Sequence, residues 1–245
     1  MKTLLLSLLL YTTVFSIQIE NAQNLPRHRH LSSQLPFQAV GVVAGDGKVG
    51  TGTLIRPNVV LTAAHVVKNT NNIQFIIYEN GVKRAIKGVA VCHPAFNDNE
   101  TDMLSISNMS VDIALIYLNT SLNKISCPLL AKMKPNLKDK YFITGCGRWN
   151  SKEPSFPLDR KLTGKVFLEN NYKDVIFLSS FNTYGMDLFC VPVHGDSGGP
   201  LMTIDGCNII HGIFSCLYTK DQIRSGSFYV PIYSNIDWIL ETIGE

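Results

Sequence analysis

Short apolar segments, many of them alternating with polar positions, run through most of this 245-residue chain. They are rich in valine and isoleucine, and glycine, proline, asparagine and aspartate separate them. Runs of this length, bounded by turn residues, are typical of strands in a β-sandwich or β-barrel. We therefore expect strands over residues 37–43, 58–62, 73–78, 113–118, 141–145, 165–168, 174–178, 207–214 and 227–232.

Helical periodicity is convincing near the C-terminal end, where Ile236, Ile239, Leu240 and Ile243 form an i, i+3, i+4, i+7 stripe. A shorter stretch, residues 63–67, predicts one further helical turn. Residues 119–140 are polar and carry prolines and lysines, which is typical of a connection between two β domains of about a hundred residues each. The pattern predicts two β-barrels and a closing helix.

Composition narrows the class of protein. Hydrophobic residues make up 45% of the chain and charged residues 17%, enough apolar material for one large or two modest cores. The net charge of +3 is small and scattered, and the basic stretch at residues 26–30 has no interleaved aromatic residues. We expect no nucleic-acid partner.

The N-terminal end has the layout of an export signal. Lys2 supplies a positive start, residues 4–15 an apolar run and Ser16 a small-residue exit, which predicts a signal peptide over residues 1–16. Residues 17–34 then form an N-terminal segment that is a candidate propeptide. Because no later segment is long and apolar enough to cross a bilayer, we expect a secreted protein without a membrane anchor.

Cysteines and sequons agree with export. Six cysteines in an exported chain predict up to three disulfides, with 15 pairings open. Since no pair has Cys-x-x-Cys spacing, we expect no metal site. Three sequons would accept glycans in a eukaryotic source, at Asn99, Asn108 and Asn119.

The stretch HGDSGGPL, residues 194–201, places Ser197 among glycines. A serine hydroxyl becomes a nucleophile when a base takes its proton, and the base needs a third group to hold its tautomer. His65 ends a buried strand after small residues, and Asp112 opens a strand that is apolar on both faces. A carboxylate buried there needs hydrogen bonds, such as one from a histidine N–H. The rival strand-to-helix nucleophile elbow needs an acid and then a histidine after Ser197, and helices throughout. The only histidine after Ser197 is His211, just 14 residues on, and the helical pattern that this fold needs is absent, so we reject it.

Taken together, these segments resemble the trypsin-like (chymotrypsin-fold) serine proteases. The resemblance is carried by Leu61-Thr62-Ala63-Ala64-His65, Asp112-Ile113-Ala114-Leu115 and Gly195-Asp196-Ser197-Gly198-Gly199-Pro200, in that order, and extends over about residues 35–243. It implies two packed six-stranded antiparallel barrels, the first over about 35–120 and the second over about 140–232, with a C-terminal helix over about 233–243.

The resemblance also implies roles. His65 would be the general base, Asp112 would orient it, Ser197 would attack the carbonyl and Ser215 would hydrogen-bond the acid. The backbone N–H groups of Gly195 and Ser197 would form the oxyanion hole. A protease of this kind acts on proteins or peptides, is open to protein inhibitors and needs no cofactor; we expect a monomer.

Asp196 is where the chain departs from the family. In relatives its counterpart is buried and pairs with an α-amino group released by cleavage before Ile-Val-Gly-Gly, a sequence that this chain lacks. Cleavage after Arg27 or Arg29 is one hypothesis. The other is that Asp196 uses a side-chain cation and no activation is needed.

The cysteine positions and the residues of the specificity pocket also differ from the family pattern. The cysteine pair that normally brackets the catalytic histidine is absent, with Gly50 or a neighbour and Val66 in its place, and we expect Cys190–Cys216 as a replacement bond. Val191 stands where trypsin has an acid, and Leu217 would narrow the pocket entrance. His194 borders the same pocket or faces solvent. We therefore expect cleavage after small or medium apolar residues.

The sequence thus predicts a secreted serine endopeptidase. One alternative is a catalytically silent homologue that acts as a binding or regulatory module, although all three triad residues remain. Another is a constitutively active, bacterial-type protease of the same fold, favoured by the missing Ile-Val-Gly-Gly and the missing disulfide. Glycosylation would argue against the latter.

Overall fold

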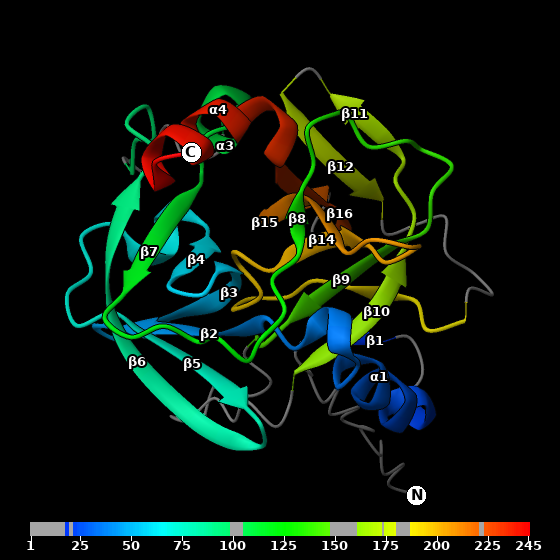
Figure 1. Ribbon diagram of the computed structural model, residues 1–245. Coiled ribbons are helices and arrows are strands. Elements are labelled where there is room, and N and C mark those ends of the chain that lie inside the picture. Colours follow the sequence, from blue (N-terminus) through cyan, green and yellow to red (C-terminus); the bar gives the residue numbers. More distant parts are fainter. Residues whose placement is uncertain are drawn as a thin grey trace, which may run out of the picture.

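The protein consists mostly of strands, arranged as two β units with a C-terminal helix, as the alternating pattern predicts (Figure 1). The computed structural model describes residues 18–19, 22–98, 105–147, 161–172, 174–179, 187–220 and 223–245. The predicted signal peptide and the sequon at Asn99 lie outside these residues. No helix in the described ranges is both long and apolar enough to cross a membrane.

The first unit is a closed barrel of six strands in the order β2-β3-β4-β7-β6-β5. Two of its hairpins are closed by Asp46-Gly47 and Asn80-Gly81, where both residues of each turn have positive φ. Such two-residue turns match the right-handed twist of the strands that they join. The strands are β2 (Val40–Gly45), β3 (Lys48–Arg56), β4 (Val59–Thr62), β5 (Gln74–Glu79), β6 (Val82–Cys92) and β7 (Ala114–Leu118).

The second unit is an eight-stranded sheet within the described residues. Seven strands follow one another in the order β10-β9-β14-β15-β16-β12-β11, and β8 (Leu129–Leu130) pairs with β15 in parallel. The other strands are β9 (Tyr141–Gly145), β10 (Leu162–Val166), β11 (Asn170–Tyr172), β12 (Val175–Ser179), β14 (Pro200–Thr203), β15 (Ile209–Lys220) and β16 (Ile223–Pro231).

The C-terminal helix α4 (Ile232–Ile243) follows the second unit in sequence but also contacts the first. The Tyr117 hydroxyl of β7 donates to the carbonyl of Thr242, and the Trp238 ring lies 5.0 Å from that of His93. A shared apolar core joins both units to this helix, through Leu61, Leu115, Phe142, Met202, Ile213 and Ile239, all of them buried.

The N-terminal segment is docked on the second unit, beside β10 in Figure 1. Strand β1 (Gln18–Ile19) pairs with β13 (Cys190–Val191), and helix α1 (Leu25–Ser32) follows a 3₁₀ turn, η1 (Ala22–Asn24). His28 is 1% exposed and its Nδ1–H donates to the Thr163 carbonyl at 2.8 Å. A second 3₁₀ turn, η2 (Leu35–Phe37), leads into the barrel.

Candidate active site

His65 lies where β4 passes into α2 (Ala64–Val67), a single turn of helix. Strand β4 is buried along its whole length because it pairs with β3 on one side and β7 on the other. Ala63 and Ala64 pack without exposed surface, so small side chains bring the strand end close to its neighbours. The imidazole keeps 23% of its surface exposed, which leaves it accessible from the cleft.

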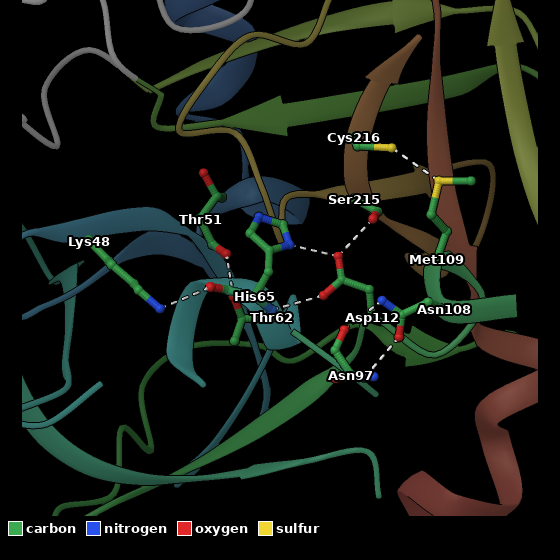
Figure 2. Close-up of polar contacts among 10 residues, drawn as sticks. All are labelled: Lys48, Thr51, Thr62, His65, Asn97, Asn108, Met109, Asp112, Ser215 and Cys216. Atoms are coloured by element: carbon green, nitrogen blue, oxygen red, sulfur yellow. Dashed lines mark hydrogen bonds and ion pairs between the residues drawn. The ribbon is translucent and has the colours of Figure 1, made fainter. Parts of the chain in front are cut away.

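Asp112, just before β7, is 3% exposed and accepts three hydrogen bonds (Figure 2). Its Oδ1 accepts the backbone N–H of His65 at 2.9 Å, and its Oδ2 accepts the His65 Nδ1–H at 2.6 Å and the Ser215 hydroxyl at 2.7 Å. Burial alone would raise the pKa of this carboxyl, but the attraction of His65 and the three hydrogen bonds lower it overall. Asp112 is therefore an anion that holds one tautomer of His65.

Ser197 lies in a tight loop whose carbonyls are held by barrel one. The Thr51 hydroxyl on β3 donates to the Gly195 carbonyl at 3.0 Å, and the Thr51 N–H donates to the Ser197 carbonyl at 2.8 Å. Gly195 has φ 93° and Gly198 φ 83°, a backbone conformation that favours glycine. Within the described residues, neither the N–H of Gly195 nor that of Ser197 donates to a protein acceptor, so both are available to donate a hydrogen bond to an oxygen of a ligand.

The Asp196 carboxylate is 2% exposed and packs against backbone. Its Oδ1 accepts the N–H of Gly147 and its Oδ2 that of Val193, each at 2.8 Å. A Cβ on Gly145 would lie 1.9 Å from Asp196 Oδ1, and one on Gly147 would lie 2.5 Å from it. The carboxylate therefore fills the space that side chains would take at 145 and 147, and it fixes the loop before Ser197.

One cavity of about 200 Å³ brings the predicted residues together, with His65, Asp112, Ser197 and Ser215 along its walls. The remaining lining residues are Phe96, His194, Phe214, Cys216 and Leu217. Val191 is not among them: it pairs with Gln18 of β1 and packs against the core of the second unit. His194 is exposed and also lines the cavity.

Comparison with known proteins identifies the family of this chain. The family model for trypsin matches residues 26–239. This chain belongs to the trypsin family.

Its trypsin-like relatives are distant in sequence. Human chymotrypsin-like elastase family member 3B is 28% identical over 221 residues, which cover 78% of this chain and 77% of that protein. Member 3A, also human, is 30% identical over 219 residues, with the same two coverages. Mast cell protease 3 of Ovis aries is 27% identical and covers 89% of this chain and 86% of its own length.

Solved structures share the fold at lower identity. Neuropsin, a serine protease expressed in the limbic system of mouse brain, has a TM-score of 0.66 at 21% identity and covers 86% of this chain and 97% of its own. HL collagenase has a TM-score of 0.64 at 17% identity, covering 85% and 94%. The predicted family and fold class are confirmed.

The cysteines of this trypsin-family chain do not pair as predicted. All six are free, so the expected Cys190–Cys216 disulfide is wrong for this structure. The Cys190 side chain is fully buried against Gly164, where an added Cβ would lie 2.1 Å from its sulfur. Cys216 Sγ instead lies 3.2 Å from Met109 Sδ, at the side of the cavity (Figure 2). The two sulfurs have different neighbours.

The two sequons within the described residues differ in access. Asn119 is exposed. Asn108 is 6% exposed, and its amide both donates to the Asn97 carbonyl at 2.7 Å and accepts the Asn97 N–H at 2.8 Å. The folded protein therefore does not present Asn108 to a glycan-transferring enzyme, and Asn119 is the accessible sequon of the two.

Several residues around the site carried no signal that sequence reasoning used. Thr51 and the lysines Lys48 and Lys68 act through backbone carbonyls far away in the sequence. Phe96 also lines the cavity. Glycines at 50 and 52 around Thr51 were the nearest hint, since they mark a strand that other chain segments approach closely.

Proposed function

We propose that this trypsin-family chain is a secreted serine endopeptidase that cleaves after small or medium apolar residues. One observation carries the proposal: buried Asp112 bonds both His65 and Ser215, and faces the same cavity as Ser197. Such a set converts a weak nucleophile into an effective one. Protein or peptide substrates, sensitivity to protein inhibitors, a monomeric state and export through residues 1–16 form part of the same proposal.

The chemistry follows from the placement of each group. Ser197 Oγ attacks the scissile carbonyl while His65 Nε2 takes its proton; Asp112 stabilises the imidazolium that forms. The N–H groups of Gly195 and Ser197 donate hydrogen bonds to the oxyanion that forms, and His65 returns the proton to the leaving amine. Water then hydrolyses the acyl-enzyme by the same route. Among the described residues, Ser197 and His65 line the same cavity without a hydrogen bond between Oγ and Nε2, and catalytic hydrogen bonds of this kind often form only when substrate binds.

The cavity walls support the apolar specificity. Leu217, Cys216 and Phe214 are apolar or weakly polar, and Asp112, the one carboxylate among the described residues that line the cavity, already accepts three hydrogen bonds. A lysine or arginine side chain would therefore meet no free anion among the lining residues that the structure describes. A volume of about 200 Å³ suits a small or medium side chain.

Docking of the N-terminal segment supports activity without cleavage at Arg27 or Arg29. Both residues lie within helix α1, and Arg27 makes two hydrogen bonds to Asp187, at 2.7 and 2.8 Å. A protease binds its substrate in extended form, so cutting there requires α1 to unfold and His28 to leave its buried site. We propose that the segment from Gln18 to Ser32 remains part of the active enzyme.

A fluorophosphonate probe tests the proposed function directly. We expect the secreted wild-type protein and a Ser33→Ala control to be labelled, and Ser197→Ala to lose the label. Absence of labelling in a folded wild-type protein would contradict catalysis and favour a silent homologue. If labelling appeared only after cleavage near Arg27 or Arg29, the proposal of an uncleaved active enzyme would be wrong while catalysis stood.

A further inference from the structure

The helical turn that carries His65 is too short to be stable alone. Helix α2 has four residues, and the last carbonyls of any helix lack partners within it. In this protein the Lys48 ammonium supplies one: Nζ lies 3.4 Å from the His65 carbonyl (Figure 2). Nζ also lies 2.8 Å from the carbonyl of Lys68, the residue that directly follows α2. Lys48 begins β3, so this contact ties the C-terminal end of α2 to a barrel strand.

All six cysteines are free, so no disulfide ties α2 to β3. The cysteine pair that would bracket the catalytic histidine is missing, and Val66 packs in its place against Gly50, where an added Cβ would meet both valine methyl groups at 2.8 Å. Packing of two methyl groups fills space but does not fix the carbonyls of α2. The Lys48 ammonium, with its charge-assisted hydrogen bonds, contacts the His65 carbonyl of α2 and the Lys68 carbonyl just after it.

A second lysine continues the connection from α2 to the cavity wall. Lys68 Nζ donates to the Phe96 carbonyl at 2.7 Å and lies 5.4 Å from the centre of the Phe96 ring. Phe96 is 4% exposed and lines the cavity beside His65. The carbonyl of Lys68 is the one that Lys48 binds, so the two ammonium groups link β3, α2 and the loop at residues 93–98 in series.

We propose that Lys48 and Lys68 form a clasp of two positioning residues, which holds the catalytic histidine and the Phe96 wall in register. The proposal rests on the proposed function, because it concerns the same site. Lys48 acts on His65 and so on the rate of the chemical step, since a misplacement of about 1 Å at a reacting group can lower a rate about 100-fold. Lys68 acts on Phe96 and so on substrate binding.

Steady-state kinetics separate the two roles. We expect Lys48→Met to lower kcat about tenfold with KM nearly unchanged, and Lys48→Arg, which keeps a charged donor, to recover most of that loss. Lys68→Met is expected to raise KM more than it lowers kcat. Lys83→Met, which removes an exposed lysine on β6, is the matched control and should equal the wild type. Equal kinetics for Lys48→Met and Lys83→Met would overturn the clasp.

Hydrogen exchange tests the clasp independently of catalytic activity. The Lys68 N–H donates to the Ala64 carbonyl at 2.8 Å, so its exchange reports the integrity of α2. We expect peptides that contain residues 64–68 to exchange several-fold faster in Lys48→Met than in Lys83→Met. Unchanged exchange would overturn the proposal even in an active enzyme. If the fluorophosphonate did not label the wild-type protein but Lys48→Met still exchanged faster than Lys83→Met, the clasp would be supported and the proposed catalysis would fail.

Discussion

Thr51 has no surface exposure and braces the nucleophile loop from the opposite unit. Its hydroxyl donates to the Gly195 carbonyl and also accepts the Cys146 N–H at 3.0 Å, while its own N–H binds the Ser197 carbonyl. These bonds hold the carbonyls of Gly195 and Ser197 in place. In the proposed enzyme the N–H groups of the same two residues form the oxyanion hole, so we expect Thr51 to position it.

Thr51→Val should lower kcat about tenfold, the equivalent of ~1.4 kcal/mol in the activation barrier. Valine keeps the side-chain shape but leaves the Gly195 carbonyl and the Cys146 N–H without this partner. Thr53 provides a matched control two residues along β3, because its buried hydroxyl has no hydrogen-bond partner among the described residues. Steady-state kinetics of both variants check this. If Thr53→Val lost as much activity as Thr51→Val, the bracing role of Thr51 would be contradicted.

Among single residues, the sequence predicted those that belong to recognisable motifs. His65, Asp112 and Ser197 each lie in a recognisable local string, and the structure brings them to one cavity. Thr51 and Lys48 could not be found this way, because a side chain bonding a distant carbonyl leaves no local pattern. The Cys190–Cys216 prediction failed because counting cysteines says nothing about the direction of each sulfur.

Helix α1 is one of the elements that the sequence pattern missed. Its residues, LPRHRHLS, are polar, and they suggested a removable segment rather than a docked helix. The helix is anchored by His28, whose ring is buried against the second unit. Strands β3 and β6 were missed for related reasons: glycines interrupt the apolar pattern of β3, and most residues of β6 are exposed or half-buried.

His28 makes the docking of α1 depend on pH. Burial lowers the pKa of His28 below 6.5, with opposing contributions from the Thr163 carbonyl and from Asp187, and a further lowering by Arg27. The unfolded chain therefore binds a proton at this site at a higher pH than the folded chain does. As pH falls below about 6.5 toward the folded pKa, the unfolded state gains protons first and the protein loses stability.

We expect wild-type protein to lose more unfolding free energy between pH 7.5 and 5.5 than His28→Gln, which cannot titrate but can still donate to Thr163. Urea unfolding at the two pH values measures both losses. His30→Gln, at an exposed position of the same helix, should behave like the wild type. Equal pH dependence in His28→Gln and the wild type would show that His28 is not the group responsible.

The whole molecule is held together by a core that belongs to neither unit alone. Leu61 and Leu115 of the barrel pack in the same cluster as Phe142 and Ile213 of the sheet and Ile239 of α4. The ion pair between Arg56 and Glu245 also joins β3 to the C-terminus, but both partners are part-exposed and such pairs contribute little. Apolar packing therefore dominates the attachment of the two units.

Scanning calorimetry should show one unfolding transition, with equal calorimetric and van't Hoff enthalpies. Because Leu115 is fully buried in the shared core, Leu115→Ala should lower the stability of the whole protein by about 2–5 kcal/mol and move that single transition. Two separated transitions, with one unaffected by Leu115→Ala, would contradict a shared core.

The packing of Asp196 against Gly145 and Gly147 has a consequence for how this protein can evolve. A Cβ at Gly145 meets atoms of the Asp196 side chain, the nearest at 1.9 Å, whereas a Cβ at Gly147 also meets the backbone carbonyl oxygen of His194 at 2.9 Å. In a lineage that descends from this chain, we therefore expect loss of the Asp196 carboxylate to precede replacement of Gly145. Gly147 is constrained by the backbone as well, so a descendant that has lost Asp196 can change position 145 while it still keeps glycine at 147.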